Sequence, residues 1–297
     1  MKIFITGGTG FVGTNLTKRF LERGYEVSIL TRKRKKSFNS VSYIHGDPTI
    51  KGDWQKVVEY HDIVINLVGE PIFGRWSRAK KEKIKKSRLL STKNLVEALK
   101  EGQTLFSASA VGYYGPHGDE ELDENTPPGN DFLSLLAKEW ESRAMEAEEK
   151  GVSVVVCRFG VVLGREGGIF RMLLPISKIG LISPIGSGRQ WFSWIHKDDL
   201  VSIFLFLIDN RQIKGPLNCT SPEPIRNKEM VEILAGVFGR KVIMPSVPVF
   251  LLRLLMGEFG SIMATGQRVI PKRLLSEGFV FRFPTFKEAV ENIIKEE

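Results

Sequence analysis

Residues 6–13, Thr-Gly-Gly-Thr-Gly-Phe-Val-Gly, have the types and spacing needed to bind a diphosphate group. Gly7 permits a tight turn after an apolar strand, Gly10 lets backbone approach a phosphate, and Gly13 lets the following helix pack closely against the strand. Free N–H groups at the start of that helix, together with its dipole, favour an anion there. This segment therefore predicts a dinucleotide site.

The residues after the second expected strand indicate which dinucleotide binds. An NAD site usually has Asp or Glu about twenty residues beyond the glycines, where the carboxylate binds the ribose 2′-hydroxyl. Here Thr31 is followed by Arg-Lys-Arg at 32–34. A guanidinium matches a phosphate by paired hydrogen bonds, so we predict NADP(H), with Arg32 as the principal contact and Arg34 as a weaker candidate. The next two lysines fit ordinary surface charges.

The hydrophobic spacing predicts the elements that position these residues. Strand patterns alternate with amphipathic helices, which indicates a parallel sheet covered by helices on both faces. The expected strands are 2–6, 26–31, 41–45, 62–67, 104–107 and 152–158, and the expected long helices are 11–23, 79–100 and 131–150. We therefore predict an α/β protein with a Rossmann-type, doubly wound parallel sheet.

Glycine and proline become more frequent after Gly160, and the expected helices become shorter. We predict an NADP(H)-binding core at 1–160 and a smaller C-terminal α/β lobe at 161–297 that carries the substrate, with some segments returning to the core. The crevice between the two parts is the expected active site.

Composition excludes several classes of protein. The 297 residues are 42% hydrophobic and 26% charged, as in a globular protein with a sizeable core. The 43 basic and 34 acidic residues give a net charge of +9, which favours anionic partners. The basic runs lack interleaved aromatic residues, so we expect no nucleic-acid binding. The densest late apolar run, 247–256, is too short to span a bilayer, so we expect no membrane anchor. The N-terminal apolar stretch at 3–5 is interrupted by Thr-Gly-Gly at 6–8, so we expect no secretory signal.

The two cysteines, Cys157 and Cys219, provide neither a disulfide framework nor metal-ligand spacing. A reducing, cytoplasmic location is therefore expected. His196 with Asp198 and Asp199 lacks a third ligand at useful spacing, so we predict no metal site. Asp199 is instead expected to cap a helix that begins near residue 200.

Several motifs together resemble the extended short-chain dehydrogenases/reductases. They are the glycine segment, Asn-Leu-Val-Gly at 66–69, Ser-Ala-Ser at 107–109 before Tyr-Tyr-Gly at 113–115, and Lys138. Further segments resemble the atypical "epimerase family" branch, namely Glu-Pro-Ile at 70–72, Gly-Ser-Gly-Arg-Gln-Trp at 186–191, Ser-Trp-Ile-His at 193–196 and the tail at 278–284. The resemblance covers essentially the whole chain. It implies a Rossmann fold and an NADP(H) site, in a branch with poorly defined substrates.

Combined with the glycine and arginine motifs, this resemblance implies a set of cofactor-binding residues. They are Gly7, Thr9, Gly10, Phe11, Val12, Gly13, Thr31, Arg32, Arg34, Leu67, Val68, Gly69, Arg88, Ser107 and Lys138.

The catalytic residues of the superfamily match this chain only in part. The resemblance implies that Ser109 orients the substrate and that Lys138 holds the nicotinamide ribose. The proton-transferring tyrosine normally stands four residues before the lysine, but Ser134 occupies that position. A serine hydroxyl titrates far above a phenol and cannot replace it without a separate base. Tyr113 or Tyr114 could substitute, and the alternative for both is packing with one hydrogen bond. Lys138 could instead pair with glutamates of its own helix.

Four residues are expected on the substrate side. Glu70 follows the fourth strand and faces the crevice if the sheet is wound as predicted. Arg189 and Gln190 stand in a glycine-rich loop and could donate hydrogen bonds to a phosphate or a sugar hydroxyl. Tyr114 lies in the loop that borders the substrate.

Two functions remain open from the sequence. One is an NADP(H)-dependent reductase or epimerase-like enzyme acting on an unidentified small substrate, either a sugar nucleotide or a carbonyl compound. The other is a regulatory or redox-sensing protein that binds NADP(H) without turnover, which Ser134 favours. The expected assembly is a monomer or a homodimer.

Overall fold

A seven-stranded, all-parallel sheet forms the centre of the computed structural model, which describes residues 1–37 and 40–295. The strand order is β11-β7-β5-β4-β1-β2-β3. The strands are β1 (Lys2–Thr6), β2 (Glu26–Thr31), β3 (Val41–His45), β4 (Ile63–Asn66), β5 (Thr104–Ala110), β7 (Ser153–Phe159) and β11 (Gly215–Cys219). The predicted Rossmann-type sheet is confirmed.

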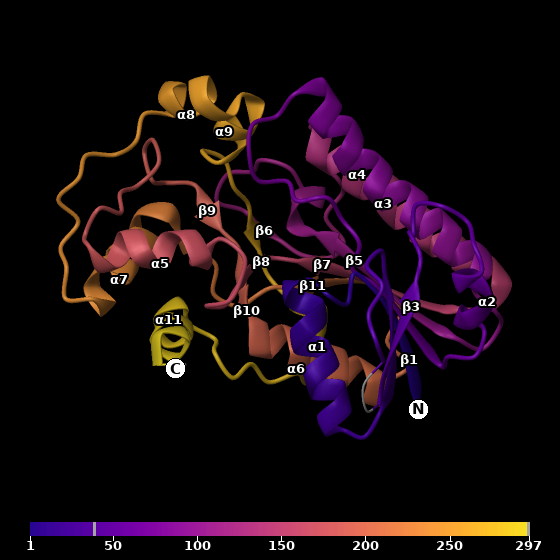
Figure 1. Cartoon of the computed structure of the whole chain (residues 1–297). Coiled ribbons are helices and arrows are strands. Elements are labelled where there is room, and N and C mark those ends of the chain that lie inside the picture. The colour runs from indigo at the N-terminus through magenta and orange to yellow at the C-terminus, as the bar shows by residue number, and fades with distance from the viewer. Residues whose placement is uncertain (38–39, 296–297) are drawn as a thin grey trace.

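Helices cover both faces of this sheet. Figure 1 shows α3 and α4 side by side over one face, with α1 and α6 on the other. The helices are α1 (Phe11–Glu22), α2 (Trp54–Val58), α3 (Arg78–Ala98), α4 (Phe132–Met145), α5 (Phe170–Lys178), α6 (Lys197–Asp209), α7 (Asn227–Val237), α8 (Val249–Met256), α9 (Glu258–Ile262), α10 (Lys272–Ser276) and α11 (Phe286–Lys295). Each face buries its own apolar layer, so the strands are apolar on both sides, as expected for a parallel sheet.

Short strands connect the sheet to the smaller lobe. They are β6 (Glu121–Leu122), β8 (Val161–Leu163), β9 (Trp191–Phe192), β10 (Trp194–His196), β12 (Ile225–Arg226) and β13 (Arg268–Val269). The lobe has its own apolar centre, formed by α5, α7 and α11 around Trp194 and Phe286.

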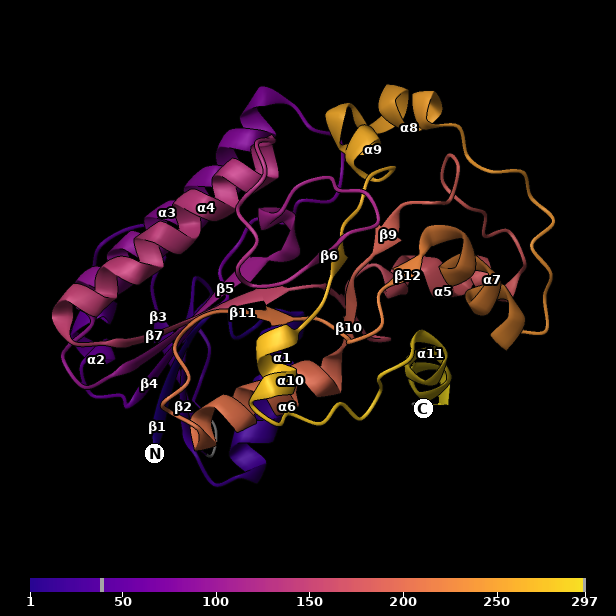
Figure 2. The same cartoon turned by 180° about the vertical axis from the view of Figure 1, so that it is seen from behind.

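The chain after residue 160 returns repeatedly to the core. α6 packs beside α1, and β11 adds the edge strand next to β7. Figure 2 shows the segment between α9 and α10 running beside β6, where β13 pairs with it. Phe279 and Phe281 then join the apolar layer under α1 and α6. Among residues 1–37 and 40–295, none of the helices combines the length and apolar character that crossing a bilayer requires.

The start of α6 differs from the sequence prediction. The helix begins at Lys197, and the N-cap is His196, whose Nδ1 accepts a hydrogen bond from the Asp198 N–H at 3.1 Å. The predicted capping role of Asp199 is wrong. Its carboxylate instead accepts hydrogen bonds from the N–H groups of Arg282 (2.9 Å) and Phe283 (3.0 Å), which holds the tail against α6.

The buried His196 predicts a loss of stability in mild acid. Burial lowers the pKa of its imidazole from the ordinary 6.5 to about 4, and a protonated Nδ1 could not accept the capping bond. Because the folded pKa lies below the unfolded one, this stability is complete above about pH 6.5 and is lost as pH falls toward 4. The loss is about 3 kcal/mol, at about 1.4 kcal/mol per pKa unit.

The variant His196→Asn keeps a capping acceptor that does not titrate. Its unfolding free energy in urea should therefore fall less than that of the natural protein between pH 6.5 and 4. Equal falls in the two proteins would contradict this role for His196.

Candidate functional site

A cavity of about 630 Å³ opens at the carboxyl ends of β1, β2 and β4. Ligands of open parallel sheets bind at this edge, where crossover connections leave in opposite directions. The predicted cofactor and substrate residues that line it are Gly7, Thr9, Gly10, Thr31, Arg32, Leu67, Val68, Gly69 and Glu70.

The glycine turn between β1 and α1 forms the floor of this cavity. Gly7 has a φ of +75°, and a Cβ there would lie 2.8 Å from the carbonyl carbon of Leu67. A Cβ on Gly13 would lie 2.5 Å from the Cα of Gly8, so the helix contacts the turn through backbone alone. Within the described chain, no side chain caps α1 at Gly10. The first N–H groups of the helix are therefore available to a phosphate, and the turn fits a dinucleotide.

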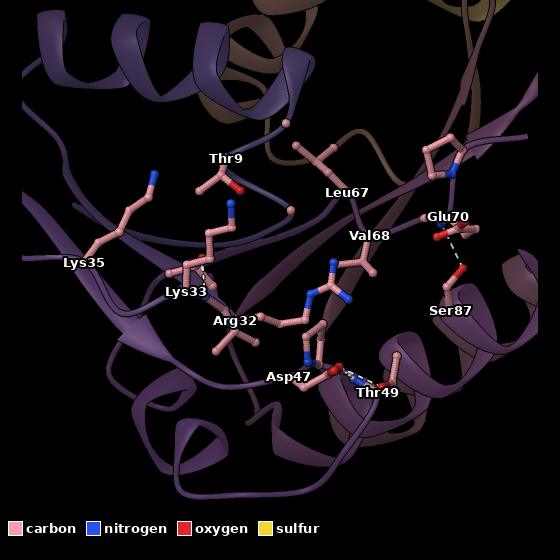
Figure 3. Close-up of a pocket in the computed structure, with 17 residues that line it drawn as sticks. Thr9, Arg32, Lys33, Lys35, Asp47, Thr49, Leu67, Val68, Glu70 and Ser87 are labelled. Carbon is pink, nitrogen blue, oxygen red and sulfur yellow. Dashed lines mark hydrogen bonds between the residues drawn. The ribbon is translucent and has the colours of Figure 1, made fainter. Parts of the chain in front are cut away.

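Three cations after β2 line the same cavity. They are Arg32, Lys33 and Lys35, whereas Arg34 is exposed and does not line it. In Figure 3 the Arg32 guanidinium extends into the cavity towards Val68, and Lys33 points towards the glycine turn near Thr9. The structure thus does not bring Arg34 to the site and brings Lys35 there. Arg32 and Lys33 form a bend directly after β2, so the alternation of side chains along the strand does not continue through them.

Asp47 and Thr49, which the sequence analysis missed, close the cavity beyond these cations. Asp47 Oδ1 accepts hydrogen bonds from the Thr49 N–H (2.8 Å) and hydroxyl (2.7 Å). Asp47 and Thr49 follow β3 and therefore lie at the carboxyl edge of the sheet. This position was the one feature of the sequence that could have indicated them.

Glu70 lines the cavity as an already paired carboxylate. Its Oε1 accepts a hydrogen bond from Lys80 Nζ at 2.7 Å, which lowers the pKa of the Glu70 carboxyl. Its own N–H donates to Ser87 Oγ at 2.9 Å (Figure 3).

Arg88 of α3 contacts the loop after β4 and does not line the cavity. Its guanidinium donates to the Glu70 carbonyl at 3.0 Å, and a Cβ on Gly69 would lie 2.8 Å from it. Burial lowers the pKa of Arg88 to about 10. Arg88 therefore holds the loop that carries Leu67, Val68 and Gly69.

The hydroxyl of Ser109 is engaged in a buried ion-pair network. It donates to Glu141 Oε1 at 2.5 Å, and Arg158 donates to both oxygens of the same carboxylate at 2.9 and 2.8 Å. Ser109 and Arg158 are each 3% exposed. No local pattern in the sequence pairs Glu141 with Arg158, because the two residues lie on different elements, α4 and β7.

The two tyrosines after β5 have different surroundings. Tyr114 is fully buried, and its hydroxyl donates to Asn218 Oδ1 (2.7 Å) and accepts from Arg158 (2.9 Å). Burial raises the pKa of Tyr114 to about 12. Tyr113 is half-buried, its ring stacks on the Arg158 guanidinium at 3.6 Å, and burial raises its pKa too. Of the two tyrosines, Tyr113 alone is partly exposed, and it is not among the residues that line the cavity.

The structure does not bring Lys138 to this group. Lys138 lies on the exposed side of α4, whereas Ser134, Ala137 and Glu141 occupy the buried side. Ser134 Oγ donates to the Gly112 carbonyl at 3.0 Å. Ser107 is buried, and its hydroxyl has no hydrogen-bond partner among the described residues. The roles of Lys138 and Ser107 thus remain predictions without a supporting contact.

Arg189 and Gln190 lie outside the cavity, in the loop before β9. The Gln190 amide donates to the carbonyls of Ile185 (3.2 Å) and Met263 (3.3 Å), and the Arg189 carbonyl accepts from Arg226. These bonds hold the loop against its neighbours, so the structure gives both residues a structural contact and no place in the lining of this cavity.

A second cavity, of about 1030 Å³, adjoins the first and shares Thr9, Gly10 and Pro71 with it. Phe11, another predicted cofactor residue, lines this cavity. Val12 and Gly13 line neither cavity and pack α1 against the sheet.

The parallel sheet and the uncapped helix after a glycine turn define a dinucleotide-binding protein of the short-chain dehydrogenase/reductase type. More narrowly, the chain belongs to the NAD dependent epimerase/dehydratase family, whose sequence model matches residues 3–219. Residues 247–293 match a domain of unknown function, DUF1731. The resemblance inferred from the motifs is thereby confirmed.

Named relatives cover almost the whole chain. The chloroplastic epimerase family protein SDR39U1 homolog of Arabidopsis thaliana is 37% identical over 99% of this chain and 87% of its own length. Epimerase family protein YfhF of Bacillus subtilis is 36% identical over 99% and 98%. The crystal structure of human epimerase family protein SDR39U1 with NADPH has a TM-score of 0.89 at 31% identity and covers all of both chains.

Removing the Glu141 charge should destabilise the fold strongly. In Glu141→Gln the buried Arg158 guanidinium loses its counter-charge, which should cost about 3–5 kcal/mol. The matched control Glu139→Gln removes an exposed partner of Lys85 from the same helix, which should cost about 0–1 kcal/mol. Urea unfolding measures both, and similar small losses would contradict the role of the buried pair.

Proposed function

We propose that this protein binds NADP(H) in the first cavity and transfers hydride to or from a small-molecule substrate. The observation that carries the proposal is the group of three cations, Arg32, Lys33 and Lys35, at the end of β2, where an NAD site would have a carboxylate. The NADPH in the crystal structure of the human relative supports the same choice.

Each part of the cavity receives one role in this proposal. The N–H groups that follow Gly10 bind the diphosphate, and the Arg32 guanidinium binds the 2′-phosphate through paired hydrogen bonds. Lys33 and Lys35 add positive charge beside it. Leu67, Val68 and Gly69 provide the wall for the nicotinamide half, and Arg88 holds that wall in place through the Glu70 carbonyl.

Tyr113 is the proposed proton donor. A bound NADPH would supply hydride to a carbonyl carbon, while the Tyr113 hydroxyl would give its proton to the carbonyl oxygen and yield an alcohol. Solvent would then return a proton to the partly exposed Tyr113. A tyrosine hydroxyl with its ordinary pKa near 10 is protonated at neutral pH, as a donor must be, and the burial that raises the Tyr113 pKa makes it a weaker acid. An epimerase would use the same group twice, first to receive and then to return the proton. The Ser109 hydroxyl donates to Glu141, so in this proposal Ser109 does not contact the substrate. Its role is to hold the buried network of Glu141 and Arg158 in place.

The second candidate is NADP(H) sensing without turnover. It is favoured by the engaged Ser109 hydroxyl, the fully buried Tyr114 and the absence of a tyrosine at position 134. Either function fits a reducing compartment such as the cytoplasm, since Cys157 and Cys219 are both free and buried.

The variant Arg32→Gln tests the choice of cofactor. It should weaken NADPH binding about 10- to 100-fold, because a charged hydrogen bond is worth about 1.5–3 kcal/mol, and should leave NADH binding nearly unchanged. Arg34→Gln is the matched control and should have little effect on either. Calorimetric titration measures all four affinities, and an equal loss for NADPH and NADH would refute the assignment.

The variant Tyr113→Phe tests turnover. With a panel of aldehydes and ketones, the natural protein should oxidise NADPH, and the variant should be about 100-fold slower, with the same NADPH affinity. A variant that keeps the natural rate removes Tyr113 from the mechanism. A natural protein that binds NADPH tightly and oxidises it with none of the carbonyl compounds favours the sensing function.

A further inference from the structure

The second cavity combines an apolar wall with a cationic wall. The apolar wall includes Ile72, Phe73 and Met172, which are 37–43% exposed, together with the buried Phe259. Large apolar side chains seldom gather around an open space without a ligand or partner to cover them.

The cationic wall comes from three helices, α1, α5 and α6. Lys18 of α1 and Arg171 of α5 both line the cavity, and neither pairs with an acid in the described part of the chain. A third cation, Lys197, lies 3.6 Å from both Glu166 and Asp198. Because Glu166 is the one acidic residue among the lining residues, the cavity has an excess of positive charge.

Packing between distant segments shapes this cavity. The rings of Phe73 and Phe259 meet edge to face, with their centroids 5.5 Å apart. The backbone N–H of Trp76 donates to the Met256 carbonyl at 3.1 Å. On the other side, the Phe11 ring lies so close to the 164–168 loop that a Cβ on Gly167 would be 2.4 Å from it. Both walls are therefore held by the fold.

We propose that the second cavity binds a small amphipathic anion with a medium-length apolar body and one carboxylate. The apolar body would cover Ile72, Phe73 and Met172, and the carboxylate would pair with Arg171 and Lys18. The cavity borders Thr9 and Gly10, so this ligand would lie beside the dinucleotide turn. Its role as the substrate rests on the proposed function, whereas its binding does not.

A displacement titration on the full chain without cofactor tests the binding. The fluorescent anion 1-anilinonaphthalene-8-sulfonate serves as the probe. The competitors are octanoate, octan-1-ol and octyltrimethylammonium, whose apolar chains have seven, eight and eight carbons. Octanoate should displace the probe at a concentration at least tenfold lower than the other two. Equal potency of the three competitors would overturn the proposal, because the cationic wall would then contribute nothing.

Two double variants locate the effect. Lys18→Gln with Arg171→Gln should weaken octanoate about tenfold and leave octan-1-ol unchanged. Arg19→Gln with Lys178→Gln removes one cation from each of the same two helices outside the cavity and should change neither competitor. An unchanged octanoate potency in the first double variant would overturn the proposal.

Two further measurements distinguish binding in this cavity from binding at α8 and from the proposed function. The exposed apolar face of α8 offers another place for the probe, so a signal that Leu254→Ser abolishes would also overturn the cavity assignment. NADPH affinity is measured on the same proteins. A preference for octanoate without NADPH binding would support the ligand proposed for this cavity and refute the proposed function. NADPH binding without a preference for octanoate would refute the proposed ligand and support the proposed function.

Discussion

The backbone contact between Gly13 of α1 and Gly8 of the preceding turn determines where both cavities lie. A side chain at position 13 would push the helix away, and the uncapped N–H groups would no longer face the ends of the strands. Thr9 and Gly10, at this contact, border both the cation-lined cavity and the amphipathic one. The relative position of two ligands is thus set by one glycine contact.

The Glu141–Arg158 pair has a comparable role on the opposite face of the sheet. Arg158 of β7 donates to Glu141 of α4 and to the Tyr114 hydroxyl, and that hydroxyl in turn donates to Asn218 of β11. Burying two opposite charges is costly unless their hydrogen bonds are satisfied, and here each charge has several partners. The hydroxyls of Ser109 and Tyr114, two of the candidate catalytic and substrate groups, form hydrogen bonds within this network. That leaves Tyr113, stacked on Arg158, as the hydroxyl with access to solvent.

Local sequence patterns predicted the strands, the long helices and the glycine turn, since a strand buried on both faces or an amphipathic helix is visible in a short window. The cation cluster was predicted in part, because Arg32 follows a strand end, but the side to which Arg34 and Lys35 point depends on backbone direction. Lys138 was assigned by alignment to a superfamily position, and the rotation of α4 turns it outward. The partners of Asp199 lie about eighty residues later, so no local pattern could distinguish that contact from a helix cap.

Phe279 and Phe281 complete the apolar layer beneath α1 and α6. Next to them, the N–H groups of Arg282 and Phe283 donate to the Asp199 carboxylate. The layer that begins with β1 is therefore closed by a segment that lies far later in the chain. During translation the N-terminal strands and helices leave the ribosome with part of this layer still uncovered. Final closure has to wait until residues 279–283 clear the exit tunnel, and until then part of the apolar surface of this layer stays exposed to water.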